Sequence, residues 1–188
     1  MSQIPFGSLL YSILRADPQR WNLLGLVNEL NLPDCWIAAG FVRNAVWDHL
    51  HGLQAKPIEG DVDVIWFDPQ CLDPTVDRKH EEQLRTAEPS ICWSVKNQAR
   101  MHLRNGDSSY HSAVDAMRYW PETATAVAAR RLTPHGFEFA APLGLEDLFN
   151  LILRPTERFV FAKRSIYEQR IREKDWLHSW PRLSEKLA

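Results

Sequence analysis

Hydrophobic residues recur at helical spacing at both ends of the chain, while its middle holds short buried or alternating runs. Over residues 1–32, apolar side chains return every three or four positions, which predicts two helices separated near Asp17. Residues 35–39 are typical of a short buried strand, and residues 42–50 have a helical pattern. The sequence therefore predicts a strand, a tight turn and a helix around Gly40.

Two further stretches are predicted to be strands. Residues 61–67 alternate aspartate with valine before they become wholly apolar, as expected of a strand with one polar end. Residues 91–103 are predicted to form a long strand, because polar residues that include Lys96 and Arg100 fall on one face. A hairpin is expected from residues 124–132 and 137–140, with its turn at Pro134, His135 and Gly136.

The remaining segments predict helices, and the whole pattern indicates an α+β fold. An exposed helix is expected around residues 76–86, and two helices, 143–153 and 156–176, are expected near the C-terminal end. We therefore predict one domain with a small mixed sheet of about five strands, flanked by helices. Its parts are N-terminal helices (1–33), a mixed-sheet core (34–142) and C-terminal helices (143–188).

Composition excludes several classes of protein. With 188 residues, 45% of them hydrophobic and 24% charged, the chain is an ordinary globular protein rather than a disordered or fibrous one. Its net charge of -2 gives no overall attraction to nucleic acid or anionic lipid. Three widely spaced cysteines, Cys35, Cys71 and Cys92, match neither a zinc site nor a disulfide framework. No apolar run is long enough to span a membrane, so we expect a cytoplasmic location.

Asp61 and Asp63 form the most specific chemical feature of the sequence. Residues i and i+2 of a strand point to the same face, so the two carboxylates should project side by side. Such a pair repels unless a cation lies between its members. Mg²⁺, with Mn²⁺ as an alternative ion, prefers carboxylate oxygens together with substrate phosphates. The competing interpretation is a pair of solvated acids at the end of a turn.

The turn around Gly40, which precedes this strand in the sequence, is a candidate phosphate-binding site. Gly40 allows close backbone approach, and the free N–H groups at the following helix start bind anions, with Arg43 nearby to pair with them. Arg43 is otherwise expected to pair with Asp61 or Asp63. Lys96 and Arg100 are two further candidates for binding phosphate, and the alternative for both is a solvent-facing position on an edge strand.

These motifs carry a family resemblance. Residues 39–44, Ala-Gly-Phe-Val-Arg-Asn, resemble the Gly-Gly-x-Val-Arg-Asp turn of the nucleotidyltransferase superfamily, which includes DNA polymerase β and the poly(A) and CCA-adding polymerases. The D-x-D strand follows after a helix, as it does in that superfamily. Further stretches between residues 34 and 183 are similar to a group of bacterial nucleotidyltransferase-like proteins; they are residues 93–102, 115–117, 120–127, 144–149 and 167–181.

The resemblance implies that Asp61 and Asp63 hold Mg²⁺ and that a nucleotidyl group moves from a nucleoside triphosphate to a hydroxyl group, with release of pyrophosphate. The acceptor would be RNA, a protein or a small molecule. Ala39 replaces the first glycine of the turn, and no serine follows the second. The resemblance also implies a third carboxylate on a later strand. Residues 91–103 contain no acid, which leaves Asp107 and Asp115 as candidates.

Two other functions fit the same residues. The lack of an acid on residues 91–103, where the resemblance implies a third carboxylate, favours a non-catalytic module of the same fold that binds a nucleotide or a protein. A D-x-D motif also serves metal-dependent glycosyltransferases, although those folds usually need a longer chain. The last predicted helix is interpreted either as a basic face for tRNA or another polyanion, or as a solvated helix of mixed charge.

Overall fold

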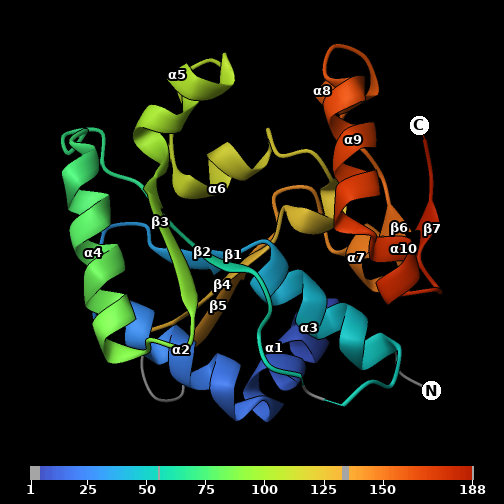
Figure 1. Ribbon diagram of the computed structural model, residues 1–188, viewed down its shortest axis with the longest axis horizontal. Helices are drawn as coiled ribbons and strands as arrows, with labels where there is room; N and C mark the ends of the chain where they lie inside the picture. Colours follow the sequence, from blue (N-terminus) through green and yellow to red (C-terminus); the bar gives the residue numbers. More distant parts are fainter. Residues whose placement is uncertain (1–4, 55, 133–135, 188) are drawn as a thin grey trace.

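A five-stranded sheet forms the centre of the computed structural model, which describes residues 5–54, 56–132 and 136–187 (Figure 1). The sheet has the order β3-β2-β1-β4-β5, in which β2 and β3 are parallel and all other pairs are antiparallel. The mixed sheet flanked by helices confirms the predicted α+β class. Its strands are β1 (Trp36–Ala38), β2 (Asp61–Trp66), β3 (Cys92–Asn97), β4 (Ala128–Arg131) and β5 (Phe137–Ala140).

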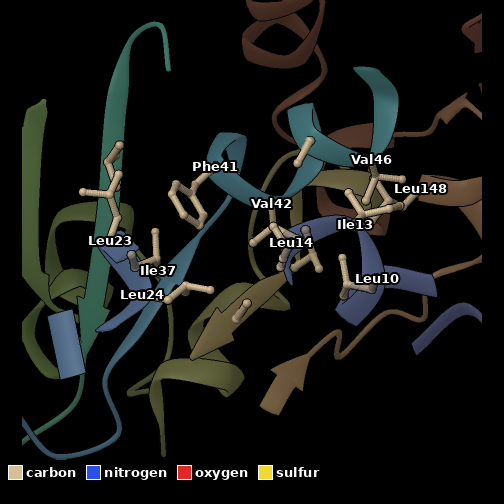
Figure 2. Close-up of a cluster of buried hydrophobic side chains, with 14 of the residues drawn as sticks. Leu10, Ile13, Leu14, Leu23, Leu24, Ile37, Phe41, Val42, Val46 and Leu148 are labelled. Atoms are coloured by element: carbon tan, nitrogen blue, oxygen red, sulfur yellow. The ribbon is translucent and has the colours of Figure 1, made fainter. Parts of the chain in front are cut away.

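Four helices of the first half of the chain pack around one face of the sheet. They are α1 (Phe6–Ala16), α2 (Pro18–Asn28), α3 (Gly40–Leu50) and α4 (Pro74–Ala87). The predicted break between the first two helices is confirmed: the side chain of Asp17 accepts a hydrogen bond from the Arg20 amide and caps α2, and Pro18 occupies its first turn. Figure 2 shows part of the core between these elements, where Leu14, Leu24 and Val42 are among the buried side chains.

Alternation along the strands divides the buried side chains between the two faces. Ile37, Val62 and Val64 belong to the large core under the first helices. Ala38 and Ile65 face the other way, where they pack with residues of the short helix α6 (Ala113–Met117) and of β4. Because α6 covers only part of this second face, the start of β2 remains accessible there.

The predicted strand over residues 91–103 is wrong beyond Asn97. The buried Asn97 side chain accepts from the Ala99 amide and donates to the Asp68 and Cys71 carbonyl oxygens, which fixes the chain in a turn. The 3-10 helix η1 (Gln98–Arg100) and helix α5 (Met101–Asn105) follow. Lys96 and Arg100 therefore do not share one strand.

In the second half of the chain, other strand and helix boundaries in the structure also differ from the predicted ones. Residues predicted to begin a strand at 124 first form the 3-10 helix η2 (Thr123–Thr125), and Pro134 and His135 of the expected hairpin turn lie outside the described residues. The predicted helix over 143–153 is replaced by the short α7 (Glu146–Phe149) and strand β6 (Ile152–Leu153), because Leu151 between them has a positive φ of 57°.

The predicted helix over 156–176 is divided into three. They are α8 (Glu157–Val160), α9 (Arg164–Lys174) and α10 (Trp176–Ser179), and α9 ends at Asp175, which has a φ of 47°. The final strand β7 (Ser184–Glu185) pairs in parallel with β6. Figure 1 shows α9 standing beside the sheet, across from α5 and α6. Within the described ranges, no helix combines the length and apolar character needed to cross a bilayer.

Candidate active site

Asp61 and Asp63 project from one face of β2, as predicted. β2 lies between two neighbours, and its register places Asp61 opposite Cys92, and Asp63 between Ser94 of β3 and Ala38 of β1. Asp61 is exposed and Asp63 is half-buried. Among the residues that the structure describes, neither carboxylate forms an ion pair, so the sequence-based alternative of a pair with Arg43 is not what the structure has.

Burial raises the pKa of Asp63 above its ordinary value, and the neighbouring Asp61 raises it further. The Ser94 hydroxyl, Arg170 and Arg43 act in the opposite direction. The Cys92 thiol donates to Oδ1 of Asp61 at 2.9 Å. Since two carboxylates share one face and neither has an ion-pair partner in the described part of the chain, their oxygens fit a hard divalent ion that takes its remaining ligands from water and phosphate.

The turn into α3 brings a strained residue and free amides to the same place. Ala39 has φ 54° and ψ -125°, a conformation that favours glycine. Its carbonyl oxygen accepts from the amides of Val42 and Arg43. The Gly40 and Phe41 amides belong to the first turn of the helix and therefore have no acceptor within it. Gly40 thus opens a helix whose N-terminus faces the aspartates.

Relief of this strain gives a first prediction. Ala39→Gly should increase the free energy of unfolding by about 1 kcal/mol, because the strain at a positive φ exceeds the entropy that glycine loses on folding. Urea unfolding measures the change. The matched control is Ala45→Gly in the interior of α3, which should decrease stability by about 1 kcal/mol. A decrease of the same size at both positions would contradict the role of the turn.

Arg43 is held rigidly beside the turn. Its side chain is buried, with the residue 5% exposed, and lies over the rings of Trp47 and Trp176 at 4.9 and 4.2 Å. Nη1 donates to Oγ1 of Thr125 at 2.8 Å, and Nη2 donates to Asn44 at 2.9 Å. Within the described chain its Nε has no hydrogen-bond partner. Burial lowers the pKa of Arg43 to about 10, so the group stays charged at neutral pH.

Two cavities meet at Asp63. The polar cavity, of about 450 Å³, is lined by both aspartates, Gly40, Arg43, Arg170 and Lys174, among others. The Met101 cavity, of about 260 Å³, is lined by Ile65, Met101, Trp120 and Pro121 together with several neutral polar side chains. Ala39, Asp63 and Arg170 line both. Asp63 therefore lies where the two cavities join.

Arg170, its partner Glu122 and the cavity-lining Lys174 are residues that the sequence-based site assignment did not include. Arg170 lies on α9, and its Nε donates to Oε1 of Glu122 at 2.7 Å. Glu122 is 0% exposed, and its Oε2 has no hydrogen-bond partner in the described structure. One signal was present in the sequence: Glu122 is the only charged residue between positions 120 and 129, where an isolated acid indicates a buried ion pair.

Lys96 and Arg100, the two further phosphate candidates, are already paired. Lys96 lines the Met101 cavity but forms an ion pair with Glu81 at 3.2 Å. Arg100 pairs with Asp77, which is 2% exposed and also accepts from the Trp66 ring nitrogen. Arg100 is not among the residues that line either cavity. The structure therefore brings Lys96, and not Arg100, to the site.

Among the described residues, no carboxylate from a later strand lies beside Asp61 and Asp63; the third acid that lines their cavity is Glu59, which precedes β2. Asp107 is held by ion pairs with Arg158 and Lys163 and accepts from Tyr110, while Asp115 accepts from the His111 amide. Neither residue lines the two cavities. In the described part of the chain, no group of three His, Cys, Asp or Glu side chains could hold a metal. The adjacent positions on β3 are Cys92 and Ser94.

Comparisons with solved structures find other proteins with this fold. One NMR structure, described as revealing a CCA-adding enzyme head domain, is 35% identical over 95% of both chains, with a TM-score of 0.84. A CCA-adding enzyme in complex with CTP has a TM-score of 0.54 at 17% identity, and one in complex with ATP has 0.50 at 18%. The chain covers 42% and 40% of these two enzymes, which share its fold.

Family comparison gives the same result. The comparison with curated proteins finds no match. A family model described as Nucleotidyltransferase matches residues 25–184, which include both aspartates, the turn at Gly40 and helix α9. The D-x-D pair thus belongs to a nucleotidyltransferase fold and not to a glycosyltransferase one. With the shared fold of the CCA-adding enzyme head domain, this match confirms the resemblance drawn from the motifs, and the chain belongs to the nucleotidyltransferase family.

Proposed function

We propose that this protein is a Mg²⁺-dependent nucleotidyltransferase that moves a nucleotidyl group from a nucleoside triphosphate to a hydroxyl acceptor. One observation carries the proposal: Asp61 and Asp63 share a face of β2, with no ion pair to another described residue, at a cavity that also contains Arg43 and the start of α3. Nucleotidyl transfer needs two carboxylates beside a positively charged site that can bind phosphate, and this cavity combines them.

Asp61 and Asp63 are the residues that would hold Mg²⁺. When bound, the ion supplies neutralisation of charge on the phosphate oxygens around the reacting phosphorus. Arg43, Arg170 and Lys174 provide further positive charge in the polar cavity, and the free amides at the start of α3 point to the same place. These groups are suited to hold the triphosphate tail in one orientation.

The reaction forms one bond and breaks one bond. The acceptor hydroxyl oxygen attacks the α-phosphorus in line with the leaving group. The bond between this phosphorus and the oxygen that bridges to the β-phosphorus breaks, so that oxygen leaves with pyrophosphate, and the hydroxyl proton is released to solvent. Binding of ATP and CTP by the structurally similar CCA-adding enzymes supports a nucleoside triphosphate as the donor.

A second candidate is a nucleotide-binding module without catalysis. The observation that favours it is the pair of residues next to the aspartates on β3, Cys92 and Ser94, in place of an acid. Asp107 and Asp115 are engaged elsewhere. Such a protein would bind a nucleoside triphosphate with Mg²⁺ and release it unchanged.

The position of the label in the donor separates these functions. The protein is incubated with Mg²⁺ and each nucleoside triphosphate, labelled at either the α- or the γ-phosphate, with RNA, protein and small-hydroxyl acceptors. We expect the α-label to enter an acceptor and the γ-label to leave in pyrophosphate. Transfer of the γ-label would instead identify a kinase. Mg²⁺-dependent binding without transfer of either label would support the binding module.

A further inference from the structure

The two cavities that meet at Asp63 differ in chemistry. The polar cavity is lined by charged side chains of both signs: Arg43 and Lys174, Arg170 in its ion pair with Glu122, and the acids Glu59, Asp61 and Asp63. In the Met101 cavity, Lys96 is neutralised by Glu81, and four apolar side chains form much of the wall: Ile65, Met101, Trp120 and Pro121. With Mg²⁺ on the aspartates, a polyanion is favoured in the first cavity, whereas a flat, largely apolar group with a few hydrogen-bonding atoms is favoured in the second.

The order of groups in a nucleoside triphosphate matches this order of cavities. Its α-phosphate lies between the nucleoside and the two outer phosphates. If the outer phosphates occupy the polar cavity and the nucleoside occupies the Met101 cavity, the α-phosphate lies at the junction, beside Asp63. The reverse orientation would place a heterocycle among charged side chains and the charged tail beside Ile65, Met101, Trp120 and Pro121, which carries a large desolvation cost.

We propose that the Met101 cavity is the nucleoside site of the enzyme, an inference that rests on the proposed function. Met101 and Trp120 are both half-buried, so they present apolar surface that a base can cover. Gln98 and Asn105 add neutral amide groups for the polar edge of the base. The Asn105 amide donates to the Tyr110 hydroxyl at 3.2 Å, which holds it in a fixed orientation.

Comparing a nucleotide with a ligand that lacks the nucleoside tests the placement. Inorganic tripolyphosphate carries the charged tail alone, and both ligands are titrated in the presence of Mg²⁺ by calorimetry. Met101→Ala should weaken nucleoside triphosphate binding about tenfold, because apolar surface that the base would cover is lost, and leave tripolyphosphate binding unchanged. Lys174→Ala should weaken both ligands by a similar factor.

Leu103→Ala is the matched control, since Leu103 lies on the same helix α5 but is 77% exposed and lines neither cavity. It should change neither affinity. A Met101→Ala variant with wild-type nucleotide affinity, or one that loses both ligands equally, overturns the nucleoside site. A wild-type protein that binds neither ligand overturns the proposed function itself. Met101→Trp, which fills the cavity, should weaken the nucleotide further and still leave tripolyphosphate bound.

Discussion

Asp63→Asn should reduce nucleotidyl transfer by about 10³-fold or more while making the folded protein slightly more stable. The loss of activity follows from the loss of a charged oxygen at the junction of the two cavities. The gain in stability follows from the pKa of Asp63, which burial and Asp61 raise in the folded state. At neutral pH the ionised carboxylate therefore opposes folding, and the amide does not.

The pH dependence of this stability difference has a defined sign. A carboxyl group with a raised pKa contributes to stability when it is protonated, and this contribution is lost as the pH rises through the folded-state pKa. The difference in unfolding free energy between Asp63→Asn and wild type should therefore be largest at neutral pH and shrink below the ordinary carboxyl pKa. Thermal unfolding at several pH values measures it.

Glu82→Gln is the control for this prediction, because it removes the same charge from an exposed position on α4. It should leave both transfer and the pH profile of stability unchanged. Asp63→Asn with wild-type transfer activity would contradict the assignment of the aspartates. A large loss of stability in Asp63→Asn would show that the carboxylate is a structural group.

Arg170→Met should destabilise the protein by about 3 kcal/mol and lower the Tm by about 10 °C. The change leaves the fully buried Glu122 carboxylate without its cation, at the point where α9 contacts the rest of the fold. It also removes a positive charge from both cavities, so nucleotide affinity should fall as well. Denaturant unfolding and nucleotide titration measure the two effects separately.

The double variant Arg170→Met with Glu122→Leu separates folding from binding. Replacing both members of a buried ion pair by apolar side chains is often close to neutral, so most of the lost stability should return. Nucleotide affinity should stay low, because the positive charge of Arg170 is still absent from both cavities. Recovery of both properties would show that Arg170 affects binding only through the fold. Recovery of neither would show that Glu122 has other partners.

The parts of the site that depend on local geometry were predictable. The period of two along a strand is enough to place Asp61 and Asp63 on one face, and the glycine turn after a buried strand is enough to place a helix start nearby. The family motifs then connect these two elements. The two residues that the turn places together, Gly40 and Arg43, do line the polar cavity with the aspartates.

The parts that depend on distant contacts were not predictable from the pattern. Alternation continues past Asn97 in the sequence, but the strand ends there because the Asn97 side chain bonds to backbone groups far along the chain. Arg100 is consequently turned toward Asp77. Similarly, the helical pattern of α9 shows a charged segment but does not show that Arg170 meets Glu122, 48 positions earlier.

Asp107 shows how an ion pair can mimic a catalytic acid in a sequence. It is the first acid after β3, so its place along the chain suits a third carboxylate. In the fold it joins the end of α5 to the α8–α9 segment, through contacts with Arg158 and Lys163. Those partners come from a part of the chain whose position the local pattern does not determine.

Arg170 both neutralises the buried Glu122 and lines the two cavities. Natural variation at this position would therefore act first on protein abundance. A destabilisation of a few kcal/mol exposes a protein to chaperones and proteases and reduces its steady-state level in the cell. Growth phenotypes of Arg170 variants would therefore combine a smaller number of protein molecules with weaker nucleotide binding by each of them. Selection on cellular fitness alone cannot distinguish these two losses, whereas purified protein at matched concentration can.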